Sequence, residues 1–95
     1  MEEIQIKAII EALIFVSESP VSLDSIREVL GDIPKKELQR LLGEMTEEYQ
    51  AASRGFNLIE VGGGYQFRTR TEYAEWVKKL KKIKQPQTLP QTSIP

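Results

Sequence analysis

The sequence has no cysteine and no histidine among its 95 residues. A chain without cysteine forms no disulfide and no thiolate metal site, and such a composition suits a reducing cytoplasm. A chain without histidine lacks a histidine general base, a Ser-His-Asp triad and an imidazole pH switch. Because these absences remove most common catalytic layouts, we expect a protein that is not an enzyme and that carries no cofactor or metal ion.

Long apolar runs are also missing. No stretch reaches the roughly 18 residues that a membrane-spanning helix needs, and the first residues, Met1-Glu2-Glu3, are acidic where a secretory signal would be basic. We therefore expect a cytoplasmic protein with no membrane partner. The length suits one small domain of marginal stability, for which help from a partner or a second copy is no surprise.

The charges are nearly balanced in number, with a net charge of −1, but they are unevenly distributed along the chain. Residues 1–53 carry five Lys and Arg against eleven Asp and Glu, whereas residues 54–95 carry eight against three. The chain thus has an acidic front and a basic back. This polarity bears on the choice of partners rather than on the fold.

Three helices are predicted in the front half of the chain. Residues 4–17 form the first, residues 23–30 the second and residues 35–52 the third, each with apolar residues at helical spacing. Ser22 is a suitable N-cap for the second helix. Gly43 costs about 1 kcal/mol relative to alanine in mid-helix, so we expect it to permit close packing against another element.

The first helix has an unusually wide apolar arc. Its charged residues fall on one narrow stripe: Glu3, Lys7, Glu11 and Glu18. The apolar arc then covers roughly 240°, against a little over ~100° for a typical surface helix. Two explanations remain open, a central helix surrounded by its own domain or a helix that presents part of the arc to another protein. On the second explanation Ile6, Ile10 and Ile14 form a self-association surface, and we expect a homodimer.

The apolar period changes from 3.6 to 2 after the third helix. Residues 56–61 and 65–69 alternate between two faces and are joined by a short glycine-rich link, which predicts a β-hairpin. A last helix follows, and its inner face is expected to consist of Tyr73, Trp76, Val77 and Leu80. The order of helix, helix, helix, hairpin, helix predicts a mainly α fold with a small β-hairpin, the winged-helix (winged helix-turn-helix) arrangement.

The boundary of this domain is expected near residue 83. Residues 1–83 form the winged-helix domain, and residues 84–95 contain three prolines and few apolar residues. This composition predicts a linker or a disordered tail.

The stretch "VGGGYQFRTR", residues 61–70, contains three consecutive glycines and raises the question of a phosphate-binding loop. A Walker-type loop continues into Lys-Ser/Thr, which is absent here, and a dinucleotide fingerprint needs a third glycine where this chain has Phe67. Both motifs also need a helix after the glycines, whereas a strand pattern follows. We therefore expect Gly62, Gly63 and Gly64 to form a tight hairpin turn, the wing turn, because such turns need a positive φ.

Basic residues of the back half are candidates for weak phosphate contacts: Arg68, Arg70, Lys78, Lys79 and Lys82. Such contacts position a protein on nucleic acid without recognising its sequence. The alternative is a solvated strand edge and helix end, where charge discourages edge-to-edge pairing. The third helix, where a DNA-binding relative would place its recognition helix, has a net charge of −1. We therefore expect at most weak, non-specific binding to nucleic acid.

Two separate stretches resemble the segregation and condensation protein B family. "IEALIFVSESPVS", residues 10–22, followed by "REVLG", is similar to the start of that family. "LIEVGGGYQFRTRTEYAEWVKKL", residues 58–80, is similar to its hairpin and following helix. The resemblance keeps the order and spacing of both motifs and covers residues 4–83.

The resemblance implies a function and a set of partners. It implies a non-enzymatic accessory subunit of the bacterial and archaeal chromosome-condensing complex, located at the nucleoid. The implied partners are a second copy, the kleisin segregation and condensation protein A and, through it, an SMC ATPase. The family usually has two winged-helix domains, so we expect a fragment or a short member. The alternative is a winged-helix DNA-binding transcription regulator, since a fold does not define a function.

Overall fold

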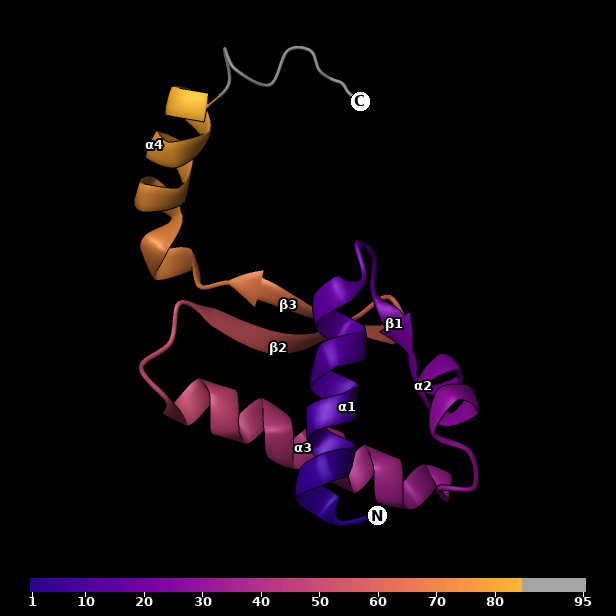
Figure 1. Cartoon of the computed structure of the whole chain (residues 1–95). Coiled ribbons are helices and arrows are strands. Elements are labelled where there is room, and N and C mark those ends of the chain that lie inside the picture. Colours follow the sequence, from indigo (N-terminus) through magenta and orange to yellow (C-terminus); the bar gives the residue numbers. More distant parts are fainter. Residues whose placement is uncertain (85–95) are drawn as a thin grey trace.

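The computed structural model describes residues 1–84 (Figure 1). In chain order its elements are α1 (Glu3–Val16), β1 (Val21–Ser22), α2 (Leu23–Leu30), α3 (Lys35–Ala51), β2 (Phe56–Val61), β3 (Gly64–Thr69), the 3₁₀ turn η1 (Thr71–Tyr73) and α4 (Ala74–Lys84). The linker or tail predicted from residue 84 lies outside the described residues, except for Lys84, which ends α4. Within residues 1–84, no helix combines the length and the apolar character that crossing a membrane requires.

Local signals in the sequence account for the helix ends. Glu2 and Gln5 form a capping box at the start of α1. The Ser22 hydroxyl accepts a hydrogen bond of 3.1 Å from the backbone N–H of Ser25, which satisfies one free donor at the start of α2. Gly31 ends α2 with a φ of 93°, a conformation that glycine adopts without strain.

The wing is a three-stranded antiparallel sheet with the order β1-β3-β2. β2 and β3 form the predicted hairpin, in register from Phe56 opposite Thr69 to Val61 opposite Gly64. β1 pairs with the other edge of β3, with Val21 opposite Tyr65. The predicted fold class, mainly α with a small hairpin in a winged-helix order, is confirmed, and β1 adds a third strand to it.

The hydrophobic core lies where the first three helices meet the hairpin. Figure 1 shows α1 crossing α3 and the sheet, and both contacts are close. The largest fully buried side chains come from all of these elements: Ile10, Ile26, Leu38, Leu41, Leu42 and Leu58. Burial of several such side chains, each contributing about 1.5–3 kcal/mol, stabilises the arrangement of the helices on the sheet.

α4 does not pack on this core. It follows η1 beyond the end of β3 and points away from the other helices (Figure 1). Trp76 and Leu80, predicted on an inner face, are exposed by 64% and 52%. Tyr73 is also exposed, and Val77 is half-buried. The prediction that these residues face the core is wrong, because the short turn η1 places α4 beyond the end of β3, away from the core.

Candidate protein-binding surfaces

The three glycines of the wing have two different roles. Gly62 and Gly63 have φ angles of 57° and 78° and make the turn between β2 and β3. Gly64 is instead the first residue of β3 and lacks a positive φ. A Cβ at Gly64 would lie 2.9 Å from the backbone oxygen of Val21, so this glycine permits the close approach of β1. The expectation of a positive φ at Gly64 is therefore wrong, although the position still favours glycine.

Arg70 joins the wing to α3 and is not a free phosphate contact. Its Nη2 donates to three carbonyl oxygens at the end of α3, those of Tyr49 (2.7 Å), Gln50 (3.2 Å) and Ala52 (2.7 Å). These carbonyls have no partner within the helix, and a cation there also favours the negative end of the helix dipole. Arg68 is exposed and its Nε donates to Gln66 Oε1 at 3.1 Å.

The lysines of α4 stay in solvent. Lys78, Lys79 and Lys82 are all exposed. The Lys79 ammonium lies 4.7 Å from the centroid of the Trp76 ring, a cation–π contact. The five residues predicted as weak phosphate contacts thus lie in different parts of the structure, since Arg70 is bound to the end of α3 and the lysines lie on α4. Their contact with phosphate stays a prediction.

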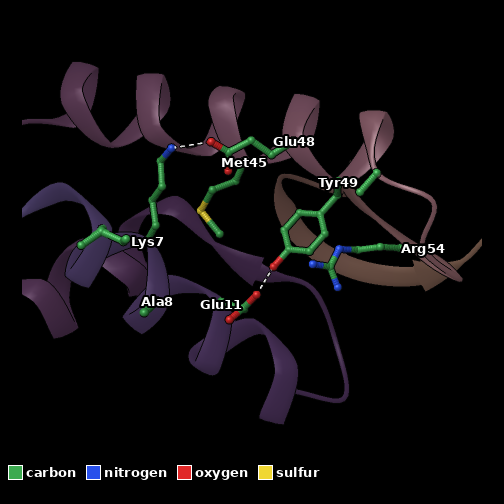
Figure 2. Close-up of a pocket in the computed structure, with 9 residues that line it drawn as sticks. Lys7, Ala8, Glu11, Met45, Glu48, Tyr49 and Arg54 are labelled. Carbon is green, nitrogen blue, oxygen red and sulfur yellow. Dashed lines mark hydrogen bonds and ion pairs between the residues drawn. The ribbon is translucent and has the colours of Figure 1, made fainter.

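Polar side chains connect α1 to α3 on one side of the domain (Figure 2). The Lys7 ammonium lies 2.8 Å from a Glu48 carboxylate oxygen and 3.0 Å from one of Glu44. The Tyr49 hydroxyl donates to the Glu11 carboxylate. Burial, followed by this hydrogen bond, raises the pKa of Tyr49 to about 12. A groove of about 330 Å³ lies between the two helices, and its lining includes Lys7, Glu11, Glu48 and Tyr49.

Arg40 is the centre of a second group of ion pairs. Its guanidinium pairs with Glu3 of α1 and with Glu37 and Glu44 of α3. The hydrogen bond from Arg40 lowers the pKa of Glu37, and the one from Lys7 lowers the pKa of Glu44. Hydrogen bonds to Glu37 and Glu3 raise the pKa of Arg40. Hydrogen bonds to Glu48 and Glu44 raise the pKa of Lys7. The only arginine of α3 is thus surrounded by carboxylates.

The exposed side of α1 presents an apolar surface. Four residues form it, and we call it the α1 face: Ile4, Ala8, Ala12 and Phe15. Phe15 is exposed by 77% and borders a hollow of about 330 Å³, whose wall includes Phe56 and Phe67. These two rings pack edge to face, with centroids 5.0 Å apart. The hollow beside Phe15 is therefore lined mainly by aromatic side chains, and only Glu11 adds a charge.

The residues predicted for self-association lie on the other side of α1. Ile10 and Ile14 are 0% and 2% exposed, and Ile6 is half-buried against the same core. The expectation that a monomer leaves these side chains in water is wrong, because α2, α3 and the sheet cover them. The wide apolar arc instead comprises two faces, one in the core and one in solvent.

A second apolar surface lies on α4 and its preceding turn. We call it the α4 face, and its residues follow each other at intervals of three and four: Tyr73, Trp76, Leu80 and Ile83. Ile83 is exposed by 68%. Apolar side chains gathered on one side of an exposed helix mark a contact with another molecule. The helical spacing of these residues was visible in the sequence, but their exposure was not.

The fold and these surfaces define a winged-helix protein whose exposed apolar faces suit contacts with other proteins. Within residues 1–84, no group of three or more Asp and Glu side chains is arranged to hold a metal ion. The family model described as "Segregation and condensation complex subunit ScpB" matches residues 8–95. The chain belongs to this family, as the resemblance in its sequence predicted.

Relatives of known name extend the comparison. The chain is 45% identical over 80 residues to segregation and condensation protein B of Syntrophotalea carbinolica, an alignment that covers 84% of this chain and 40% of that protein. It is 36% identical over 94 residues to the protein of the same name from Alkaliphilus oremlandii, covering 99% of this chain and 50% of that protein. The chain spans half or less of the length of these two relatives.

Solved structures show the same fold. A crystal structure of a dimer of the ScpB N-terminal domain complexed with an ScpA peptide matches with a TM-score of 0.71 and 35% identity, covering 78% of this chain and 91% of that one. ScpB from Mycobacterium tuberculosis matches with a TM-score of 0.79 over 100% of this chain and 56% of that one, at 23% identity. The second match supports the fold alone.

Proposed function

We propose that this chain acts as an accessory, non-enzymatic subunit of the SMC–kleisin complex that condenses and segregates chromosomes. It forms a homodimer through its winged-helix domain, residues 1–83, and binds the kleisin ScpA, which connects it to an SMC ATPase. It therefore works in the cytoplasm at the nucleoid. The observation that carries this proposal is the 35% identity to an ScpB N-terminal domain whose crystal structure is a dimer with an ScpA peptide.

The exposed surfaces of the chain favour a role in binding other proteins over a role in sequence-specific recognition of DNA. α3 would be the recognition helix of a winged-helix transcription regulator. Its Arg40 is paired with carboxylates of Glu3, Glu37 and Glu44, so it is not free to contact a base edge. The α1 face and the α4 face instead expose large apolar side chains, which suit a protein partner.

The test measures self-association and kleisin binding in the same sample. Light scattering of the purified chain at micromolar concentration should give twice the monomer mass. Calorimetric titration with ScpA from the same organism should give saturable binding, and a scrambled ScpA peptide of equal composition should give none. A monomer that does not bind ScpA would refute the proposal.

A further inference from the structure

We propose that a groove between α3 and the free edge of β2 binds an extended, basic segment of a further partner protein, which adds to the sheet as a fourth strand. We call it the α3–β2 groove. One wall is the side of α3 from Gln39 to Gln50, and the other is β2 from Leu58 to Glu60, with Tyr65 of β3 beside it. Its volume is about 620 Å³. The inference goes beyond the proposed function, because it assigns a binding site in addition to those for a second copy and for ScpA.

The first argument is that β2 has a free strand edge. The sheet order β1-β3-β2 places β2 at one side of the sheet. Within residues 1–84, the backbone of β2 forms backbone hydrogen bonds only with β3. A strand paired on one side leaves the N–H and C=O groups of every second residue available to another strand. β2 contains neither proline nor lysine, residues that commonly protect such an edge.

The second argument is that α3 forms a support of the right length beside this edge. Figure 1 shows β2 lying over α3, and the two elements are in contact. The helix residues that line the groove follow each other at intervals of three and four, so they belong to one side of α3. From Gln39 to Gln50 the helix rises about 16 Å. An extended segment of about five residues has this length.

The third argument is the glycine in the helical wall. Gly43 is exposed in the middle of α3, where glycine weakens a helix relative to alanine. An added Cβ there would meet nothing within 4 Å, so no described part of this chain fills the space. A glycine permits another backbone to approach closely. Gly43 therefore leaves room for the main chain of a bound segment between α3 and β2.

The fourth argument is the chemistry of the lining, which selects a basic protein segment. Glu47 and Glu60 are the charged residues that line the groove, and both are exposed. Within the described residues neither forms an ion pair, whereas carboxylates on the other side of α3 are paired with Lys7. Two free carboxylates attract lysine or arginine and repel nucleic acid. The half-buried Ile59 and Tyr65 give the alternate side chains of a strand an apolar contact.

The α3–β2 groove is separate from the other two candidate surfaces. None of its lining residues belongs to α1 or α4. It therefore stays accessible when partners cover the α1 face and the α4 face, and it can be occupied at the same time.

Titration with a synthetic strand tests the proposal. The probe is a capped seven-residue peptide of alternating lysine and valine, added to the full chain labelled with ¹⁵N. We expect saturable binding with a Kd below about 1 mM. Amide shifts should change at Gly43 and over Leu58 to Glu60, and amide exchange in β2 should slow. Absence of saturable binding up to that concentration, or shifts confined to other elements, would overturn the proposal.

Modified peptides test whether the probe adds as a strand. One control peptide carries N-methyl groups on its valine nitrogens and another on its lysine nitrogens. At least one should bind about 10-fold more weakly or worse, because methylation removes donors to the β2 edge. A peptide with glutamate in place of lysine should not bind. Equal binding of both methylated peptides would overturn strand addition.

Filling the groove gives the first test on the protein itself. Gly43→Leu should weaken binding of the probe at least about 10-fold, because the new side chain occupies the space above Gly43. Its thermal midpoint should not fall below that of the parent, since leucine is a better helix former than glycine. Ala51→Leu is the matched control, because Ala51 is exposed on α3 and does not line the groove. Equal binding by both variants would overturn the proposal.

Removing the two carboxylates gives the second test. Glu47→Gln/Glu60→Gln should weaken binding of the probe about 5- to 10-fold at low salt, the range for two exposed ion pairs. Glu28→Gln, which removes an exposed carboxylate on α2, should leave it unchanged. Loss of affinity by the same factor in both variants would contradict a specific role of the groove and overturn the basic occupant.

The outcomes separate this inference from the proposed function. Gly43→Leu should dimerise and bind ScpA as the parent does. If Gly43→Leu loses ScpA binding, or if ScpA displaces the probe, the groove is the kleisin site and the assignment of a further partner is overturned. If the parent dimerises and binds ScpA but not the probe, only this inference fails. If the parent binds the probe in the groove but neither dimerises nor binds ScpA, only the proposed function fails.

Discussion

Gly64 shows how a single residue without a side chain permits a strand to pair. Its Cα sits opposite Ser22, and an added Cβ would lie 2.9 Å from the Val21 oxygen, a backbone atom that cannot move aside alone. We expect Gly64→Ala to lower the free energy of unfolding by about 1–3 kcal/mol, the usual cost of overpacking. Urea unfolding measures it.

Gly55→Ala is the control for this substitution. An added Cβ at Gly55 meets nothing within 4 Å, and its φ is not positive. Its effect should stay within about 0.5 kcal/mol of the parent. If both alanine variants have the same urea midpoint of unfolding, the close approach of β1 does not explain why position 64 favours glycine.

Gly43 gives the opposite expectation on α3. The close packing predicted for it is wrong, since a Cβ there meets nothing within 4 Å and the residue is exposed. Gly43→Ala should therefore stabilise the free protein by about 0.5–1 kcal/mol, because alanine is the better helix former. The thermal midpoint should rise by several degrees. A lower midpoint would contradict the open environment of this position.

At the scale of elements, Arg70 holds the wing against the end of α3. Removal of its guanidinium leaves three carbonyl oxygens without this donor. We expect Arg70→Met to cost about 1.5–3 kcal/mol of unfolding free energy, the range for hydrogen bonds to a charged group. Arg68→Met, which removes an exposed arginine two residues away, should change it by less than about 0.5 kcal/mol. Similar losses from both would show that Arg70 acts only as a surface charge.

The ion pairs between α1 and α3 make part of the stability depend on pH. Lys7 lowers the pKa of Glu44 from its ordinary value near 4.5. The Glu44 carboxylate therefore binds a proton more readily in the unfolded chain than in the folded protein. The contribution of this ion pair to the free energy of unfolding is therefore present above about pH 4.5. It is lost as the pH falls through the lowered pKa that Glu44 has in the folded state. Comparing urea unfolding at about pH 6 and pH 3, we expect Lys7→Met to lose less stability on acidification than the parent does. Identical losses would contradict a role for this pair.

At the scale of the whole molecule, the distribution of charge argues against sequence-specific binding to DNA. Most positive charges of the back half are the lysines of α4, whereas α3 carries more acidic than basic residues. We expect no sequence-specific binding by this chain, and non-specific Kd values of about 10⁻⁴–10⁻⁶ M or weaker at physiological salt. Selection from random duplexes, followed by titration at two salt concentrations, checks this. Recovery of a motif bound ~10³-fold tighter than a scrambled duplex would favour a regulator instead.

The elements of this protein could be predicted from its sequence because their signals are local. Helical spacing, the Ser22 cap and the alternation of residues 56–61 each depend on neighbours within a few positions. The order of elements followed directly, and with it the winged-helix arrangement. The lack of cysteine and histidine likewise needs no structure to exclude thiolate and imidazole chemistry.

The tertiary structure decided which surfaces are free. The apolar arc of α1 was visible on a helical wheel, but only the position of α2, α3 and the sheet shows that Ile10 is in the core and Phe15 in solvent. The hydrogen bond from Arg70 to the Tyr49 carbonyl joins residues that are 21 positions apart in the chain. The direction of α4 likewise depends on where β3 ends in the folded domain. Local sequence patterns define a helix and its apolar side, whereas the partner of that side is set by packing between residues that are distant in the chain.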